Sequence, residues 1–421
     1  MKPRIALALS GGGFRASIFH LGTLRCVAEL GWLSDVDVIS TVSGGSILGA
    51  FAAQRWAALL AEGGTVDAFE RIIAEPFIAA ITTRNFLKEW LLRAWTWPFR
   101  KVASKAFTRT QAAAELLDTF FFDGQLCSSL PQKPLLILNA TNLQSIRAWR
   151  FTRNGMGDSR VGHCSWESNP LLLSVCVGAS AAFPPVFPPA RIERAGHRFG
   201  PPLYNEVPLT PYPLIPLTDG GVYDNSGLEA LSKAVKLPGS DDLVDLASLL
   251  IVSDGGTSAS YHFSPSGIPG IADAALLYRV DGIARQQVSA LHTRDVMSSF
   301  VQGSRQGIFT GLTSCVDRVP APDFERYCSL VPEANQIPRE ILPLLCKVRT
   351  SLDRFSRIEV DALRYHAYSL TAAFAWCYRA RFPEEYRSDV LASAWRINFD
   401  SSKINAWKNA LADSDKTLQI R

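Results

Sequence analysis

The sequence predicts an α/β protein in which a central, mostly parallel sheet is flanked by helices and followed by a helical C-terminal extension. The first observation is an apolar run at residues 5–9 that ends in Ser10 and three glycines and leads into helical periodicity over residues 16–30. The second is that the same order returns at once, with a strand pattern over residues 36–42 and a helical pattern over residues 44–61. Strand, tight turn and helix in repetition are typical of an α/β sheet.

Later segments extend this pattern and then change it. Gly31 directly follows the first helical segment, where glycine favours a helix C-cap. Short apolar runs bounded by turn residues predict buried strands at residues 134–143 and 248–254. After about residue 260 long helical patterns dominate. We therefore predict an α/β domain over residues 1–260 and a mainly helical C-terminal extension over residues 261–421.

Composition excludes several classes of protein. The chain has 421 residues, of which 47% are hydrophobic, so it can bury a large core. Its net charge of +4 is too small to indicate a nucleic-acid binder. The eight cysteines form no CxxC pair, which argues against a zinc site and favours buried thiols in a reducing compartment. No apolar run is long enough to span a membrane, so we expect a cytoplasmic protein. Nothing in the sequence indicates its oligomeric state.

The glycine loop "SGGGFRA" over residues 10–16 is the first candidate for chemistry. Three successive glycines between a strand and a helix let backbone N–H groups converge without interference from side chains. The helix start adds partial positive charge, so such a loop binds a phosphate or a developing oxyanion. The GK[ST] sequence of a phosphate-binding P-loop is absent.

The stretch "STVSGGS" offers three serines as nucleophiles. A nucleophile elbow places its serine on the sharp turn between a strand and a helix, with small residues two positions to either side. Ser40 has valines at those positions, and Ser46 would lie inside the helix. Ser43 stands where the strand pattern ends, with Thr41 before it and Gly45 after it. Ser43 is therefore the best candidate, although Thr41 departs from the usual glycine.

The general base has more than one candidate. Asp219 in "TDGGVYDN" precedes two glycines and a helix start, and a second Asp-Gly-Gly occurs at Asp254. A carboxylate is a weak base unless its site is dry and its hydrogen bond well aligned. A histidine-dependent triad also stays open, since His262, His292 and His366 follow in a suitable chain order.

Taken together, these motifs resemble those of the patatin-like phospholipases, a family of serine–aspartate lipid acyl hydrolases. The resemblance covers residues 4–235 and includes the segments "LILNATNLQSIRAWRFT" and "ASAAFPPVFPP". It implies a patatin-like sheet, an acyl-enzyme mechanism on the acyl esters of membrane lipids, and no metal or organic cofactor. It also implies a role for each matching residue: Ser43 as nucleophile, Asp219 as base, Gly11, Gly12, Gly13 and Arg15 in the oxyanion hole, Thr41, Gly44 and Gly45 in the elbow, and Gly220 and Gly221 beside the aspartate.

A basic, aromatic segment over residues 84–110 is the candidate for contact with lipid. Aromatic side chains interleaved with cations suit a membrane surface. The residues concerned are Trp90, Arg93, Trp95, Trp97, Arg100 and Lys101. The alternative is a helical lid or core helix with a solvated basic face.

Two other functions stay open at this point. One is an esterase or thioesterase that acts on non-lipid substrates with the same dyad. The other is a non-catalytic scaffold of the same fold, against which the intact serine, aspartate and glycine loop count.

Overall fold

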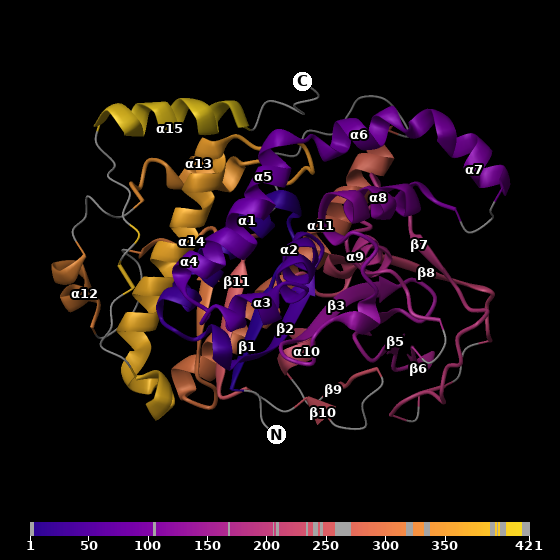
Figure 1. Cartoon of the computed structure of the whole chain (residues 1–421), viewed down its shortest axis with the longest axis horizontal. Coiled ribbons are helices and arrows are strands. Elements are labelled where there is room, and N and C mark those ends of the chain that lie inside the picture. Colours follow the sequence, from indigo (N-terminus) through magenta and orange to yellow (C-terminus); the bar gives the residue numbers. More distant parts are fainter. Residues whose placement is uncertain are drawn as a thin grey trace.

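The computed structural model of the chain describes most residues between Arg4 and Ser414 (Figure 1). The described residues are 4–103, 107–166, 169–204, 206–207, 210–232, 235–238, 243–244, 247–256, 271–316, 323–331, 337–387, 392–393, 395 and 401–414. His262 lies outside them.

A ten-stranded mixed sheet forms the centre of the described structure. Its main path runs β12-β11-β1-β2-β3-β4-β5-β6, with β8 pairing with β3 and β7 with β8. The strands are β1 (Ile5–Leu9), β2 (Val36–Val42), β3 (Leu135–Asn142), β4 (Arg147–Thr152), β5 (Gly155–Asp158), β6 (Gly162–Ser165), β7 (Ala190–Glu193), β8 (Leu214–Asp219), β11 (Leu249–Asp254) and β12 (Gly307–Gly311). A separate antiparallel pair joins β9 (Val235–Lys236) and β10 (Leu243–Val244).

The predicted parallel sheet is confirmed for one half of this structure. Strands β12, β11, β1, β2 and β3 are parallel to one another along this path. From β3 onward, the pairings with β4, β5, β6, β7 and β8 are antiparallel. Because β1 and β2 are parallel neighbours, the loops that follow them meet at one edge of the sheet, and this edge carries the predicted motifs.

Helices cover both faces of the sheet (Figure 1). Ile5, Leu7 and Leu9 of β1 join one buried cluster, whereas Ala6 and Ala8 join a second cluster on the opposite face. The helices are α1 (Gly13–Glu29), α2 (Gly44–Ala53), α3 (Trp56–Ala61), α4 (Val66–Phe69), α5 (Glu75–Thr83), α6 (Phe86–Leu92), α7 (Trp97–Ala103), α8 (Arg109–Leu117), α9 (Leu173–Ser180), α10 (Glu229–Ser232), α11 (Ile271–Gln302), α12 (Phe324–Leu330), α13 (Leu342–Lys347), α14 (Arg357–Tyr378) and α15 (Ser401–Ser414).

Local sequence signals account for the end of α1 and for the start of α14. The chain leaves α1 through Gly31 at φ 74°, the left-handed conformation that glycine adopts without steric cost, as its position predicts. Helix α14 begins at a capping box in which Ser356 and Glu359 each accept the other's backbone N–H.

The C-terminal part is mainly helical, as predicted, and it also completes the core. Strand β12 extends the parallel half of the sheet beside β11. Helix α14 packs so closely on α1 that a side chain at Gly22 would overlap with the carbonyl of Arg364. The domain boundary near residue 260 stays a prediction. Among the described residues, no helix has the length and apolar character needed to cross a bilayer.

Candidate active site

Ser43 occupies a sharp turn between β2 and α2. Strand β2 ends at Val42, helix α2 begins at Gly44, and Ser43 itself has φ 52° and ψ −117°. A non-glycine residue in this region is strained, and such strain is typical of functional sites. The turn therefore has the geometry of a nucleophile elbow.

The two glycines after Ser43 allow the elbow to lie directly against the glycine loop. A side chain at Gly44 would overlap with the backbone of Gly13, and one at Gly45 would overlap with the carbonyls of Leu9 and Ser10. Any larger residue at these positions would push the nucleophile away from the loop that follows β1.

Thr41, two residues before Ser43, fits into the elbow because Gly49 has no side chain. A Cβ atom on Gly49 would lie 2.5 Å from Thr41 Cγ2, so glycine at position 49 accommodates the methyl group. The Thr41 hydroxyl donates to the Ile137 carbonyl and lies 2.9 Å from Ser46 Oγ. Ser46 Oγ lies 2.8 Å from Ser180 Oγ, which in turn accepts the Ser43 N–H at 3.1 Å. This chain of hydrogen-bonded hydroxyl groups holds the backbone of the elbow in place.

Ser40 has a structural role. Its hydroxyl donates to the Gly227 carbonyl at 2.7 Å and accepts from Asn139 Nδ2 at 2.9 Å. Ser40 is fully buried in the sheet, so its oxygen cannot reach a substrate.

Asp219 ends β8 and is buried beside the elbow. Its Oδ1 accepts the Gly221 N–H at 2.7 Å, whereas its Oδ2 has no hydrogen-bond partner within the described chain. Burial raises the pKa of Asp219 to about 6, and hydrogen bonding with Ser43 opposes this rise. Because it lacks a full hydrogen bond among the described residues, Oδ2 can accept a further one.

The glycine loop lies next to Ser43, but its three N–H groups are not equivalent. Gly11 N–H already donates to the Asn225 carbonyl at 2.9 Å. Gly12 caps α1 and Gly13 is its first residue, so their N–H groups belong to the helix end that has no intrahelical acceptor. A Cβ atom on Gly11 would lie 3.2 Å from Ser43 Cβ, which places this helix end beside the nucleophile. Gly12 and Gly13 are thus better placed than Gly11 to bind an oxyanion.

Arg15 is buried, and its guanidinium is engaged by backbone carbonyls outside the elbow. Its guanidinium donates to the carbonyls of Gly255 at 3.3 Å and Val348 at 2.8 Å, and burial lowers its pKa to about 10. These contacts agree with a role of Arg15 in positioning the glycine loop, and a direct effect of its charge on an oxyanion stays a prediction. Its side chain ties the glycine loop to the loop after β11 and to the C-terminal half of the chain, because its donors are already engaged there.

The alternative bases have other partners. Asp254 Oδ1 accepts the Gly256 N–H at 2.9 Å. Burial raises the pKa of Asp254, and the hydrogen bonds with Gly256 and Ser10 and the charge of Arg15 oppose this rise. His292 Nδ1 contacts Asp224 Oδ1 at 3.1 Å. His366 is buried against the Leu312 carbonyl, and burial lowers its pKa to about 4.

Asn225 is a site residue to which sequence reasoning gave no role. Its carbonyl accepts the Gly11 N–H, and its Nδ2 lies 3.5 Å from the Gly11 carbonyl oxygen. Its Oδ1 lies 2.5 Å from where a Cβ atom on Gly221 would be. Asn225 therefore fills the space between the oxyanion loop and the aspartate loop. The available signal was its place in "TDGGVYDN", six residues after Asp219.

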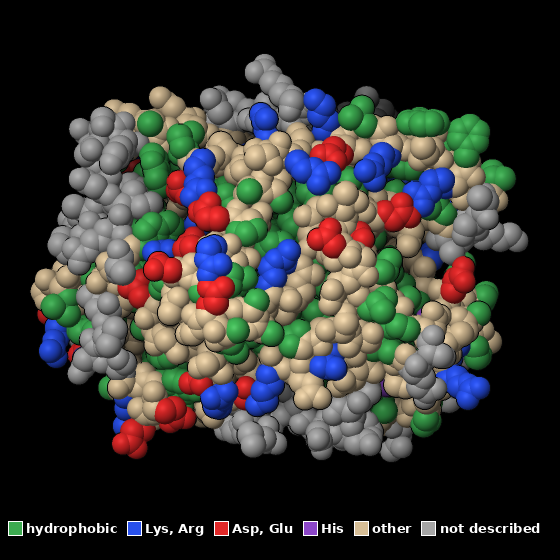
Figure 2. Space-filling view, viewed as in Figure 1, with side chains coloured by type: hydrophobic (Ala, Val, Ile, Leu, Met, Phe, Trp, Pro, Cys, Tyr) green, Lys and Arg blue, Asp and Glu red, His purple; other side chains and the backbone are tan. Residues whose placement is uncertain are grey.

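The basic, aromatic segment forms α6, α7 and the turn between them, and only part of it is exposed. Trp95, Phe99 and Val102 are 74%, 72% and 89% exposed. Figure 2 shows hydrophobic side chains along this edge, at the upper right. The prediction for Trp90 is wrong, because it is 3% exposed and packs on Trp97 with ring centroids 4.7 Å apart.

The four other residues predicted there differ in their surroundings. Arg93 and Lys101 are exposed, and Trp97 is half-buried. Arg100 is also half-buried, and it forms an ion pair with Glu115.

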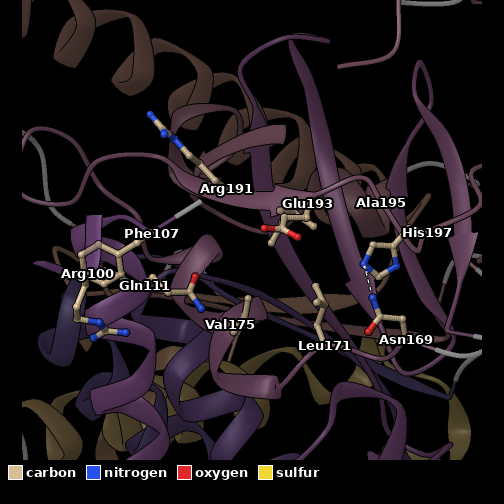
Figure 3. Close-up of a pocket in the computed structure, with 11 residues that line it drawn as sticks. Arg100, Phe107, Gln111, Asn169, Leu171, Val175, Arg191, Glu193, Ala195 and His197 are labelled. Atoms are coloured by element: carbon tan, nitrogen blue, oxygen red, sulfur yellow. Dashed lines mark hydrogen bonds between the residues drawn. The ribbon is translucent and has the colours of Figure 1, made fainter. Parts of the chain in front are cut away.

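A pocket of about 500 Å³ lies beside this segment (Figure 3). Arg100 and Phe107 line one side, and Glu193 and His197 line another, with His197 Nε2 3.5 Å from Asn169 Nδ2. None of its lining residues belongs to the elbow, the glycine loop or the aspartate loop, so this pocket is separate from Ser43.

Several solved structures are similar to this chain. Human GIVD cytosolic phospholipase A2 is 14% identical, with 89% of this chain and 59% of that chain covered and a TM-score of 0.49. The same human protein in complex with methyl gamma-linolenyl fluorophosphonate gives a TM-score of 0.45 at 14% identity, with coverage of 91% and 59%. VipD from Legionella pneumophila is 11% identical, with 94% of both chains covered and a TM-score of 0.27. The chain thus spans 59% of the human structures.

Comparison with sequence families gives the more specific finding. No curated protein matches the sequence. A family model described as patatin-like phospholipase matches residues 7–232, which include the glycine loop, the elbow and the aspartate loop. Since this match covers more than half of the chain, the resemblance seen in the motifs is confirmed, and the chain belongs to the patatin-like phospholipase family.

Proposed function

We propose that this protein is a lipid acyl hydrolase of the phospholipase A type, in which Ser43 is the nucleophile and Asp219 the general base. The observation that supports this most is the state of Asp219. Its carboxylate is buried next to a strained serine, Oδ1 accepts the Gly221 N–H, Oδ2 makes no full hydrogen bond among the described residues, and its pKa is raised to about 6. These are the properties that make a weak base effective.

The proposed reaction follows from these positions. Asp219 takes the hydroxyl proton of Ser43 as the serine oxygen attacks the ester carbonyl. The N–H groups of Gly12 and Gly13 and the positive end of α1 stabilise the resulting oxyanion. When this intermediate collapses, the alcohol leaves with the proton from Asp219 and the acyl group stays on Ser43. Water, deprotonated by Asp219, then releases the fatty acid and regenerates the serine.

The exposed apolar residues on α6 and α7 suit peripheral contact with a membrane. Leu92, Trp95, Phe99 and Val102 are exposed together, and Arg93 and Lys101 lie beside them. Phe86 at the start of α6 packs edge-on against Phe14 of the glycine loop, with ring centroids 6.4 Å apart, and both rings are buried. This contact joins the segment to the core beside the glycine loop.

The test of the proposed function compares lipid with soluble substrate. Wild-type protein should release fatty acid from phospholipid vesicles, and should hydrolyse short soluble esters or thioesters less efficiently, because the exposed apolar face favours a membrane substrate. Lipid profiling of mixed membranes, with Ser43→Ala as the background, identifies the products. Turnover of soluble esters alone would favour the esterase alternative. Absence of turnover from a folded sample would favour a non-catalytic scaffold.

Replacing Trp95 and Phe99 with serine should weaken binding to vesicles by roughly 100-fold or more, because each aromatic side chain that becomes buried in lipid contributes about 1.5–3 kcal/mol. Sedimentation of the protein with vesicles measures the change. Hydrolysis of a soluble ester should stay within about 2-fold, since neither side chain contributes to the core. The matched control is Leu330→Ser, an exposed apolar residue on α12. Equal vesicle binding by all three proteins would refute the membrane-contact face.

A further inference from the structure

Arg285 on the long helix α11 introduces a cation beside the aspartate that we propose as the base. Its guanidinium lies over the ring of Phe183, with Cζ 4.9 Å from the ring centroid. Phe183 directly follows Ala182, whose carbonyl accepts the N–H of Asp219 at 3.1 Å. The electrostatic effect of Arg285 on Asp219 lowers the pKa of that carboxyl group against the larger effect of burial. These contacts place the guanidinium next to the catalytic centre.

The direction of α11 supports this placement. His292, seven residues after Arg285, contacts Asp224 in the loop that follows Asp219. Seven residues are about two helical turns, so both side chains lie on the same side of α11 and face the aspartate loop. Leu276, Val280 and Ile283 lie on the other side of the helix and are exposed.

Arg285 is available for a ligand. Its ion pair within the described chain is with Asp281, one turn earlier on the same helix, at 2.8 Å. About half of the Asp281 side chain is exposed, so this pair contributes little to stability. A guanidinium held over an aromatic ring still presents N–H groups, and these can pair with two oxygens of an anion.

We propose that Arg285 binds the phosphodiester of a glycerophospholipid whose acyl ester is attacked by Ser43, and so selects phospholipids over neutral acylglycerols. This inference rests on the proposed function. In a glycerophospholipid the phosphate lies only a few bonds from the scissile ester. A phosphate near the ionised Asp219 would be repelled without a nearby cation, and Arg285 removes that penalty.

The experiment compares two lipids that differ only in the phosphocholine group. Dioctanoyl phosphatidylcholine and dioctanoylglycerol are hydrolysed in the same mixed micelles at about pH 9, well above the Asp219 pKa of about 6, so that the base is ionised in every variant. Arg285→Gln should lower kcat/KM for the phospholipid by roughly 10- to 100-fold, the range of a charge-assisted hydrogen bond. The value for the neutral lipid should change by less than about 2-fold.

Two further variants serve as controls. Arg285→Lys should retain part of the preference for the phospholipid, because it keeps the charge but loses the paired donors. Arg294→Gln should leave kcat/KM for both lipids unchanged, since Arg294 is exposed on the same helix and donates to the carbonyl of Ala290. Equal losses on both lipids, or no loss on the phospholipid, would overturn the proposal and leave the proposed function intact if Ser43→Ala is inactive.

A binding measurement separates the two proposals completely. The Ser43→Ala protein and the double variant Ser43→Ala/Arg285→Gln are titrated with monomeric dodecylphosphocholine by calorimetry. We expect the double variant to bind at least about 10-fold more weakly. Equal affinity overturns the role of Arg285 whether or not the wild-type protein hydrolyses lipid.

Discussion

Ser43→Ala should abolish labelling by a fluorophosphonate probe and lower acyl release by roughly 10⁴-fold or more. The reason is that no other serine at the elbow can replace it. The Ser40 hydroxyl is hydrogen-bonded to Gly227 and Asn139, and the Ser46 hydroxyl is hydrogen-bonded to Thr41 and Ser180. Gel fluorescence with the probe and fatty-acid release from vesicles measure the two effects.

The matched control for this experiment is Ser40→Ala. This change removes a buried hydrogen bond, so the free energy of unfolding should fall by about 1–3 kcal/mol, while the folded protein keeps its labelling. Labelling that persists in Ser43→Ala and disappears in Ser40→Ala would identify Ser40, and not Ser43, as the nucleophile.

Asp219→Asn should abolish lipid turnover without weakening the fold. The amide cannot accept the proton of Ser43, so we expect kcat to fall by roughly 10³- to 10⁴-fold. The amide oxygen can still accept the Gly221 N–H. Stability should not fall, because at pH 8 the native protein carries a buried charge that the amide lacks. A pKa raised from 3.8 to about 6 corresponds to a cost of about 3 kcal/mol for that charge.

The ionisation of Asp219 should make folding stability and activity depend on pH in opposite directions. Because the pKa of Asp219 is raised in the folded protein, its favourable contribution to stability is present below about pH 4 and lost as the pH rises through about 6. Activity changes in the opposite direction. In the wild type, kcat/KM should rise with pH with an apparent pKa of about 6, as the base becomes ionised.

Asp254→Asn is the matched control, since Asp254 ends β11 and is followed by two glycines, as Asp219 is at the end of β8. Both variants are followed by thermal unfolding and by pH–rate profiles. We expect Asp254→Asn to retain turnover and the acid limb near pH 6. Retained turnover in Asp219→Asn together with loss of turnover in Asp254→Asn would identify Asp254, and not Asp219, as the general base.

Local signals were sufficient to predict four of the five strands in the parallel half of the sheet, whereas β12 lies in the part predicted to be helical. The run over residues 5–9 is apolar throughout and the run over residues 36–42 is mainly apolar, because β1 and β2 are buried on both faces. Each of the two ends in a turn that glycine makes possible. Gly31 likewise predicted the end of α1, since a helix cap depends on residues close in sequence. The same locality allowed Ser43 to be selected among three serines.

Contacts between distant parts of the chain could not be predicted in this way. Arg15 reads as an oxyanion residue from its place in the glycine loop, but its partner Val348 is more than 300 residues away. Trp90 reads as a membrane anchor, but Trp97 and Phe187 bury it. Hydrophobic periodicity alone cannot separate a buried aromatic residue from one at a membrane surface.

The antiparallel half of the sheet was missed for a related reason. Strands β5 and β6 are four residues long, too short to show clear alternation of apolar and polar side chains. Arg285 gave no signal at all, because its significance comes from a helix that returns to the sheet after β11 and passes the aspartate loop.

The contact between Thr41 and Gly49 has a consequence for how this elbow could have arisen. Threonine at position 41 is accommodated only while position 49 lacks a side chain, and a methyl group at both positions would collide. From an ancestor with glycine at 41 and a larger residue at 49, the change at 49 must therefore come first. Such order dependence is epistasis at the level of a single methyl group, and a double-mutant cycle over the two positions measures its strength.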